Sequence, residues 1–306
     1  RQQANAPRTT AGVVGPPPAQ PLLWETMTVA TLRLALRRTR TVLLPLGVTE
    51  QHGYHLPLGT DTLCVTEVAK RVSARTGAVV APPLPYSFSG GELVGTINVS
   101  PQTMSLLVQE ILSAMVAQGF ENIVLLPGHG GSENFAALKD ALRLYLQLHR
   151  TGRQPVIALA PYWDFSPTWL RWFARGDFHA GVVETALVMA LAPHLVNRRR
   201  MVTDPPAWLR RLTAHPDNYQ RVETLCADPH VVPRVRQDPA IRVGVMGYPE
   251  RATPALGARI VAEMVTGLAA LVRRLETRRA RRYRPVKVRR KGLVIIGPGA
   301  TRKRRR

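Results

Sequence analysis

The stretch TVLLPLGVTEQHGYHLPLGTDTLCVTEVAKRVSARTGAVVA, residues 41–81, decides the fold. It begins with a short apolar run over residues 41–47 that ends at a glycine, a pattern typical of a buried strand. Residues 61–76 then place apolar side chains at helical spacing and stop before another glycine. Residues 78–81 form a further short apolar run, and we expect a second strand there.

The same alternation of apolar runs and helical periodicity continues along the chain. It predicts further strands at residues 122–126 and 155–160 and further helices at residues 101–118, 133–149, 181–191 and 253–275. Strands that alternate with helices of this length favour a mostly parallel sheet covered on both faces, so we expect an α/β fold, a layered α/β/α sandwich. Residues 198–237 are polar, basic and irregular, and no element is assigned to them.

The positive charge is concentrated at one end of the chain. The 306 residues include 42 Lys or Arg and 20 Asp or Glu, a formal net charge of +22. Residues 273–306 hold 16 of the basic residues and one acid, so +15 of the charge lies there. Blocks of like charge usually stay disordered. We therefore expect residues 277–306 to be either a solvated tail or an arm that binds nucleic acid non-specifically.

Composition narrows the class of protein. With 45% hydrophobic residues the chain can bury a core, which excludes global disorder. No continuous apolar run reaches the ~18 residues that span a bilayer, so we expect no membrane partner. Residues 1–21 lack the apolar centre of a signal peptide and are expected to form a flexible arm ahead of one domain, residues 22–276. The two cysteines are too few for a disulfide scaffold, which favours a cytoplasmic location.

Two carboxylates and two imidazoles follow the first predicted strand closely. Glu50, His52, His55 and Asp61 lie in the segment EQHGYHLPLGTD, where glycine and proline favour a loop that folds back on itself. Nitrogen and oxygen ligands of this kind suit Zn, Mn or Fe. Each of these residues taken alone is better explained as an exposed polar loop residue, but the whole string favours a metal site.

Three further segments carry candidate functional residues. His129 lies between glycines in GHGGS, residues 128–132, which is either a phosphate-binding turn or a turn that presents a histidine ligand. His179 precedes a predicted helix, and Glu184 interrupts its apolar run. A carboxylate there is unfavourable unless it is paired, binds a metal, or points to water in the first turn. The glycine-rich residues 90–96 suggest a mobile substrate loop or a subunit contact.

Aromatic side chains gather in PYWDFSPTWLRWF, residues 161–173. They either pack in the core or at an interface, or they form a lid over a flat heterocyclic substrate. Arginines nearby can hold an anionic group. We expect Trp169, Arg175, Asp177 and, from the glycine-rich turn, Gly130 to bind the substrate.

The motifs LPLGVTEQHGYHLPLGTD, PGHGGSEN and DFHAGVVET occur in this order and are followed by GVMGYPERATPALGARIVAEM. Over residues 40–272 the chain thereby resembles the creatininase (creatinine amidohydrolase) family. That family includes creatininase, formamide hydrolases of riboflavin-like cofactor biosynthesis and the peptidase of the mycofactocin system. The resemblance implies a compact α/β domain, often assembled as a homo-oligomer such as a hexamer, that hydrolyses amide or cyclic amide C–N bonds with a metal-activated water.

The resemblance also implies roles for individual residues. The metal ligands would be Glu50, His52, Asp61, His129 and Glu184. Asp61 would bridge two divalent ions, which could be Zn, Mn or Fe. Glu184 would complete the second ligand set or anchor the substrate, and His179 would act with it in catalysis as a general acid or base. His55 matches the family string and would lie just behind the ligands.

Two positions depart from the family pattern. Creatininase carries a metal-binding Glu two residues after the His of the second motif, where this chain has Gly131, and this argues against creatinine as the substrate. Many relatives have Asn where this chain has Ser132. The sequence favours a non-peptide amidohydrolase with a small-molecule substrate. A metallopeptidase of a modified peptide, a nucleic-acid-binding protein acting through its tail, and a metal-free family member remain as alternatives.

Overall fold

The structure is a computed structural model that describes residues 20–149, 154–277, 286–289 and 292–295. Its helices and strands are β1 Leu22–Leu23, α1 Val29–Arg38, β2 Thr41–Leu46, α2 Thr60–Thr76, β3 Val79–Val80, α3 Pro101–Ala117, β4 Asn122–Pro127, α4 Ser132–Leu148, β5 Val156–Leu159, α5 Pro167–Phe173, α6 Val182–Leu191, α7 Pro206–Leu212, β6 Gln220–Glu223, β7 Arg234–Gln237, α8 Pro254–Glu276, β8 Val286–Arg289 and β9 Gly292–Ile295.

The central sheet has five strands in the order β1-β3-β2-β4-β5, and every neighbouring pair is parallel. All residues of β2 and β4 are buried. Strands that are covered on both faces have no polar side, which explains why their sequences are continuous apolar runs rather than alternating ones. The predicted parallel sheet is therefore confirmed.

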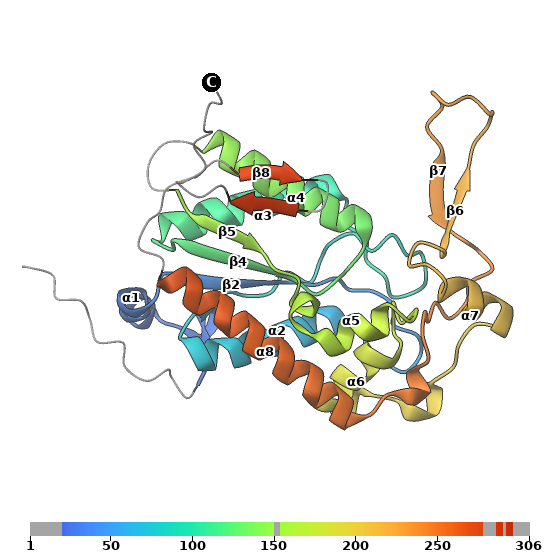
Figure 1. Cartoon of the computed structure of the whole chain (residues 1–306), viewed down its shortest axis with the longest axis horizontal. Coiled ribbons are helices and arrows are strands. Elements are labelled where there is room, and N and C mark those ends of the chain that lie inside the picture. Colours follow the sequence, from blue (N-terminus) through green and yellow to red (C-terminus); the bar gives the residue numbers. More distant parts are fainter. Residues whose placement is uncertain (1–19, 150–153, 278–285, 290–291, 296–306) are drawn as a thin grey trace, which may run out of the picture. The chain divides into compact units, whose positions relative to one another are not determined.

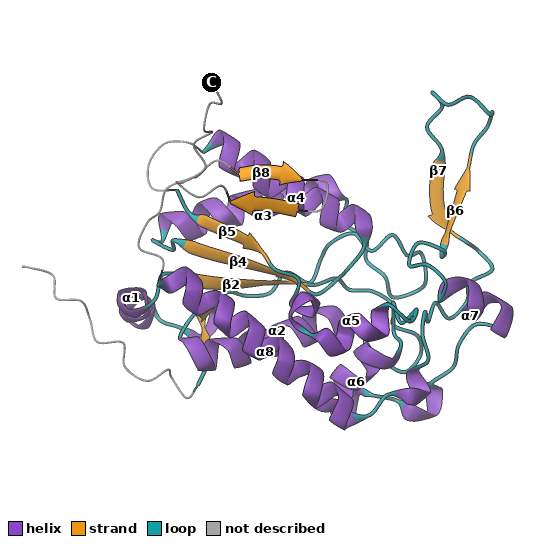
Figure 2. Cartoon of the chain, in the orientation of Figure 1, coloured by secondary structure: helices purple, strands orange, loops and turns teal. Residues whose placement is uncertain are grey.

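Helices cover both faces of this sheet (Figure 1, Figure 2). On one face, α2, α6 and α8 contribute residues such as Val65, Leu187 and Met264 to one hydrophobic core. On the other face, α3 and α4 contribute residues such as Leu112 and Leu138 to a second core. Three layers with a core on each side of the sheet are the expected α/β/α sandwich, and the predicted fold class is confirmed.

Several elements were not predicted from the sequence. The short helices α1, α5 and α7 and the strands β6 and β7 had no assignment, whereas the longer predicted helices begin and end within two residues of the observed ones. The missed elements are short or exposed, so few of their residues show the burial periodicity on which the prediction depends. The strands β6 and β7 pair antiparallel within the segment that was left unassigned.

The helix α8 is long and apolar enough, by length and composition, to cross a membrane, although its sequence contains no continuous apolar run of that length. Core helices of globular proteins pass the same test. In this structure α8 packs against α2 and α6, and one stripe of its residues, including Ile260, Met264 and Leu268, is fully buried in the core. Its amphipathic pattern thus fits a core helix.

The chain divides into two units, residues 1–276 and residues 277–306. In the second unit β8 pairs antiparallel with β9, which differs from the expectation of a tail without structure. The rest of the expected tail, apart from Thr277, lies outside the described residues. Of the expected N-terminal arm, residues 1–19 also lie outside them.

Candidate metal centre

The predicted site residues meet at the carboxyl end of the sheet, where the parallel strands β2 and β4 end beside each other. The loop after β2 folds back on itself, because the Glu50 amide donates to the Leu58 carbonyl at 2.9 Å. Gly53 has a φ of +62°, which allows the tight turn that this path requires. Gly128 lies against the first turn of α2, where a Cβ would come within 2.6 Å of the Asp61 carbonyl oxygen.

The first ligand group consists of Glu50, Asp61 and His129. His129 Nδ1 lies 3.1 Å from Glu50 Oε2 and 3.3 Å from Asp61 Oδ2. One ligand atom from each residue lies within 4.8 Å of the others. Both carboxylates are buried, and buried carboxylates are unfavourable unless a cation compensates them.

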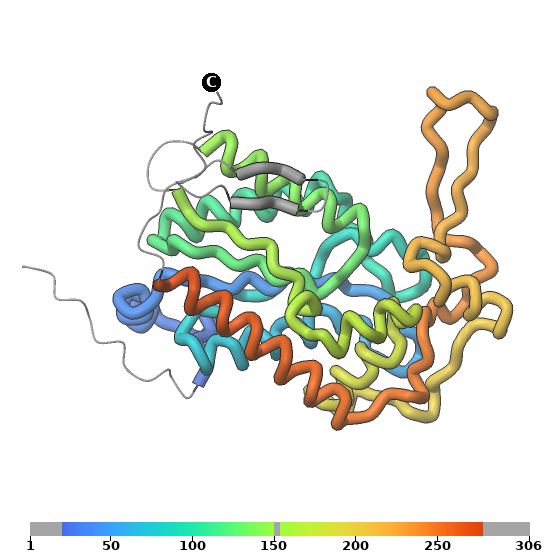
Figure 3. Tube along the Cα trace, in the orientation of Figure 1, coloured from blue at the N-terminus to red at the C-terminus, as the bar shows by residue number. Residues whose placement is uncertain are grey.

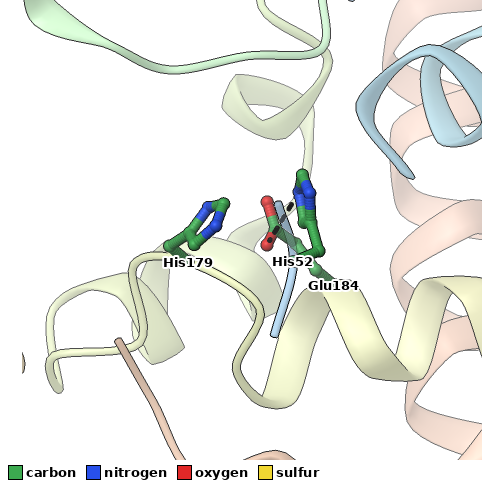
Figure 4. Close-up of side chains that lie close together, drawn as sticks. All are labelled: His52, His179 and Glu184. Carbon is green, nitrogen blue, oxygen red and sulfur yellow. Dashed lines mark ion pairs between the residues drawn. The ribbon is translucent and has the colours of Figure 1, made fainter. Parts of the chain in front are cut away.

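The second ligand group is formed by His52 and Glu184, and a ring nitrogen of His179 lies within 4.8 Å of their ligand atoms (Figure 4). His52 is fully buried, and its Nε2 atom lies 3.8 Å from Glu184 Oε2. The rings of His52 and His179 are 4.4 Å apart between centroids. Figure 4 shows the three side chains converging from the β2–α2 loop and from the start of α6. Glu184 therefore points inward to the site rather than out to water.

Asp61 joins the two groups. Its Oδ1 atom lies 3.1 Å from His52 Nε2, and its Oδ2 atom faces His129 at 3.3 Å. One carboxylate oxygen is thus available to each group, the arrangement expected of a bridging ligand. Among the described residues, Glu50 Oε2 and Asp61 Oδ2 are buried and make no well-directed hydrogen bond, and both face the His129 ring. Buried acceptors are rarely left without partners, so this nitrogen and oxygen donor set fits divalent metal ions.

The electrostatics of the groups are strongly perturbed. Burial alone would raise the pKa of Glu50, but the neighbouring His129 holds it well below its usual range. Burial alone would lower the pKa of His52, but the Asp61 carboxylate raises it to about 10. Burial raises the pKa of Glu184. Such a balance of desolvation against opposite charges is common at functional sites.

His179 and Gln51 lie together at the edge of the centre. His179 Nε2 is 2.8 Å from the Gln51 carbonyl oxygen, 3.1 Å from Gln51 Nε2 and 4.0 Å from Glu50 Oε1. The His179 ring is partly exposed and lines the adjoining cavity. It is therefore placed within reach of both the ligand groups and a bound molecule.

Residues behind the ligands hold them in place. The Ser89 hydroxyl donates to Glu50 Oε1 at 2.8 Å, and the Gly91 amide donates to that hydroxyl at 3.0 Å. His55 Nε2 lies 2.9 Å from Thr185 Oγ1, next to Glu184, and burial lowers the pKa of His55 to about 4. His55 thus lies behind the ligands, as expected.

Ser89 was not predicted from the sequence, because a serine in a glycine-rich loop is a common feature. The expected mobile loop around it is held by side-chain hydrogen bonds. Asn98 Oδ1 accepts from the amides of Ser89 and Gly90, each at 3.0 Å. Gln237 Oε1 accepts from the Glu92 amide at 2.7 Å. The loop therefore forms a fixed wall of the site.

A cavity of about 210 Å³ opens beside the two groups. It is bordered by the expected site residues Glu50, His129, Gly130, His179 and Glu184. Its apolar walls are Phe173, Phe178, Leu212, Ile241 and Met246. Ser132, Asp217, Tyr219 and Gln237 add polar groups. The walls taken from residues 212–241 could not be identified beforehand, since this segment carries no recognisable motif.

Three of the residues predicted to bind substrate do not line this cavity. Trp169 is buried in the core against Tyr162 and Trp163, with ring centroids 5.7 and 6.3 Å away. The Arg175 guanidinium lies 5.9 Å from the centroid of the Trp172 ring. The ring of Trp169, which was expected to form part of a lid over the substrate, is therefore packed in the core, because large apolar rings gain most from complete burial.

Asp177 has a structural role in place of the predicted contact with substrate. Its Oδ1 atom accepts from the Val182 amide at 2.6 Å, and its Oδ2 atom accepts from the Val183 amide at 2.9 Å. These are the free amides at the start of α6. Asp177 thereby fixes the helix that carries Glu184.

Comparisons with known proteins agree with this geometry. The model of the family Creatininase, creatinine amidohydrolase, matches residues 25–272. The creatinine amidohydrolase of Pseudomonas putida is 34% identical over 183 residues, which cover 54% of this chain and 70% of that protein. The mycofactocin precursor peptide peptidase of Mycobacterium ulcerans (strain Agy99) is 32% identical over 245 residues, which cover 76% of this chain and 85% of that protein.

Solved structures show the same likeness. A crystal structure of creatinine amidohydrolase (creatininase) superposes with a TM-score of 0.68 at 27% identity and covers 84% of this chain and 99% of that one. A structure named creatininase Mn gives a TM-score of 0.67 at 26% identity, with 84% and 100% covered. A mutant creatininase of Zn-Zn type gives a TM-score of 0.67 at 27% identity and covers 84% of this chain and 99% of that one. The chain therefore belongs to the creatininase family and is a hydrolase of carbon–nitrogen bonds.

Proposed function

We propose that this chain hydrolyses a non-peptide amide or cyclic amide of a small molecule with the help of two divalent ions. The observation that carries the proposal is Asp61, which offers one carboxylate oxygen to each of two ligand groups. Glu50 and His129 would complete one set of ligands, and His52 and Glu184 the other. The Zn or Mn in the names of related structures supports these metals, and Fe suits the same donors.

Divalent ions at such a centre supply Lewis-acid activation of water and of the amide carbonyl. The chain's own residues would then position the substrate and move protons. His179 lies between the ligand groups and the cavity, so it would deliver a proton to the departing nitrogen. The apolar walls, with Phe173 and Phe178 in T-shaped contact at 4.9 Å, would hold the body of the substrate and exclude water.

The substrate is expected to differ from creatinine. Creatininase has a metal-binding Glu at the position of Gly131, whereas here a Cβ at residue 131 would lie 2.5 Å from His129 Nε2. As His129 is placed, no side chain fits at that position. Glu184 lies 3.8 Å from His52 and would supply the carboxylate instead. A different carboxylate position changes the shape of the cavity next to the reacting bond.

A screen of formamides, cyclic amides and linear amides tests the proposal. We expect turnover that is lost with a chelator and restored by Zn, Mn or Fe. A His179→Asn variant should keep its metal and lose turnover, while His194→Asn, an exposed histidine outside the site, should behave as the wild type. If His179→Asn lost the metal as well, His179 would be a ligand and the proposed proton transfer would be wrong.

A second candidate is the trimming of a short modified peptide. It is favoured by the mycofactocin precursor peptide peptidase match, which covers more of this chain than the creatinine amidohydrolase match does. Short peptides belong in the same screen. Metal-dependent release of a terminal residue or dipeptide, with no turnover of small amides, would replace the first candidate by the second.

A further inference from the structure

The strands β6 and β7 form a two-stranded hairpin that stands away from the helices and the central sheet (Figure 1, Figure 3). Val222 and Val235 are directly opposite each other in its register and so lie on one face. Both are exposed, and beyond them Leu225 is 102% and Val232 87% exposed. An isolated two-stranded hairpin is only marginally stable in water. The exposed apolar side chains therefore indicate that another surface covers the hairpin.

The outer edge of β6 is complementary to itself. Among the described residues, each strand of this two-stranded sheet has one neighbour, so the other edge of β6 is unpaired by them. Antiparallel pairing of β6 with a second copy about a two-fold axis through Val222 places Val222 opposite its own copy. The same register places Arg221 opposite Glu223, and Glu223 opposite Arg221. Each ion pair thus forms twice, and opposite charges in directly facing positions stabilise antiparallel strands.

Other two-fold pairings of the two strand edges are disfavoured by like charges. Residues that are directly opposite each other must lie on the same face of the sheet. The nearest alternative two-fold registers of β6 are therefore centred on Arg221 or on Glu223 instead of Val222. They bring Arg221 opposite Arg221 or Glu223 opposite Glu223. The open edge of β7 carries Arg234 and Arg236 around Val235, and each corresponding two-fold register places arginine opposite arginine. Charges on an edge strand commonly block unwanted pairing, so β7 is protected and β6 is not.

We propose that β6 pairs antiparallel with β6 of a second copy of this chain, in the register centred on Val222. The result is a four-stranded sheet in the order β7-β6-β6-β7. Its one face carries a continuous row of Val235 and Val222 from both copies. Its other face carries Arg221 and Glu223, which already lie 3.1 Å apart within one chain and would gain partners across the axis. The contact is isologous and therefore closes at two copies.

The pairing would also support the cavity. Tyr219 and Gln237 flank the base of the hairpin and line the cavity, and the Gln237 side chain accepts from the Glu92 amide. Fixing the hairpin in a four-stranded sheet would fix this wall. Pairing through the hairpin is independent of the metal centre and can be measured without metal or substrate.

A charge-swap experiment on the full chain tests the pairing through the molar mass measured by analytical ultracentrifugation. Variant one is Arg221→Glu. Variant two is Glu223→Arg with Arg234→Glu, which preserves the pair that Glu223 makes with Arg234 inside the hairpin. Each variant alone should show half the wild-type mass, with a dissociation constant raised roughly tenfold or more. An equimolar mixture should recover the wild-type mass. The exposed Arg143→Glu on α4 is the control and should keep that mass.

Cross-linking tests the register independently of any loss of stability. In a Cys226→Ser background, Val222→Cys should form an intermolecular disulfide under mild oxidation, because residue 222 faces its own copy. Val235→Cys, at the matching position of β7, should not. The proposal would be overturned by a monomeric wild type. It would also be overturned if the mixture failed to recover the wild-type mass and the residue-222 cross-link was absent, or if residues 222 and 235 cross-linked equally.

Discussion

Asp61 is the residue on which the two ligand groups depend. It is buried at the start of α2, and its two oxygens face different histidines. Burial alone would lower the pKa of His52, but the contact with the Asp61 carboxylate raises it to about 10. Burial would likewise lower the pKa of His129, but the Glu50 carboxylate raises this pKa well above its usual value. The neighbouring carboxylates therefore favour the doubly protonated, cationic form of both imidazoles before a metal binds.

Metal binding should consequently release protons. A doubly protonated imidazole must lose one of its two ring protons to bind a metal, so uptake at pH 7.5 should release about two protons per chain, one from each imidazole. Affinity should rise as the pH increases toward the raised pKa values. Calorimetric titration with Zn in two buffers of different ionisation enthalpy measures the number released. Release of no protons would show that the histidines are not the ligands.

Gly131 is tested by a matched pair of substitutions. In Gly131→Ala the new Cβ would lie 2.5 Å from His129 Nε2, so the ring must move away from Glu50 and Asp61. We expect metal affinity to fall roughly tenfold or more. In Gly130→Ala the nearest atom is in the Trp163 ring at 3.6 Å, an ordinary contact, and affinity should not change. Equal affinities in both variants would contradict the proposed role of His129.

Much of the metal centre could be predicted at this scale, and less of the cavity. Glu50, His52, Asp61 and His129 lie in glycine-rich loops after strands, where carboxylates and imidazoles are unusual enough to stand out. Ser89 could not be predicted, because a hydroxyl gains its role from a contact 39 residues away in sequence. Trp169 and Asp177 were assigned to the substrate on residue type alone, which does not distinguish a buried packing or capping role from a binding role.

At the scale of elements, α6 depends on a side chain that precedes it. The cap residue of this helix is Gly181, which has no side chain to satisfy the first amides. Asp177 does so from outside the helix, at 2.6 and 2.9 Å. The helix also carries Glu184 and Thr185, which contact His52 and His55. The position of the second ligand group therefore depends on this cap.

Removing the cap should destabilise the protein and loosen the centre. We expect Asp177→Ala to lower the free energy of unfolding by about 1–2 kcal/mol, a typical loss for a helix cap. Urea denaturation with metal removed measures this change. Asp140→Ala, which alters an exposed carboxylate on α4, serves as the control and should fall within about 0.5 kcal/mol of the wild type. No difference between the two variants would show that the cap contributes little.

Helices and strands could be predicted where burial gives their apolar residues a regular pattern along the sequence. Strands β2 and β4 are covered on both faces and so stand out as apolar runs, and α2 and α8 each bury one stripe. The hairpin β6–β7 has no buried face of that kind, and its alternating Arg, Val and Glu side chains are almost all partly or fully exposed. Without burial, the sequence has no periodic signal to distinguish a strand from a loop.

At the scale of the whole molecule, the charge separates from the catalytic unit. Residues 277–306 form a unit of their own, and the two ligand groups and the cavity lie within residues 1–276. Most of the net charge of +22 belongs to the end of the chain. The uneven distribution of charge could be found from the sequence, because charged residues can be counted directly. The paths of the chain that form the cavity could not be predicted, since they depend on contacts between distant segments.

Deleting residues 277–306 decides between the two interpretations of this segment, a solvated tail and an arm that binds nucleic acid, and the second interpretation predicts the following. The full chain should bind labelled duplex DNA with an affinity that falls roughly 1,000-fold or more between 50 and 200 mM salt, as expected for several phosphate contacts. The shortened chain should not bind, and its metal content should stay unchanged. Fluorescence anisotropy measures the binding. Equal binding by both chains would place the nucleic-acid surface elsewhere in the molecule.

The metal content of the purified protein tests the central claim most directly. Elemental analysis of the wild type should find about two divalent ions per chain, as in other two-metal hydrolases. Asp61→Ala should lose most of both ions, because Asp61 contributes an oxygen to each group, while the exposed Asp140→Ala should keep them. Equal, near-zero metal in the wild type and in Asp61→Ala, even after incubation with Zn, Mn or Fe, would contradict the account.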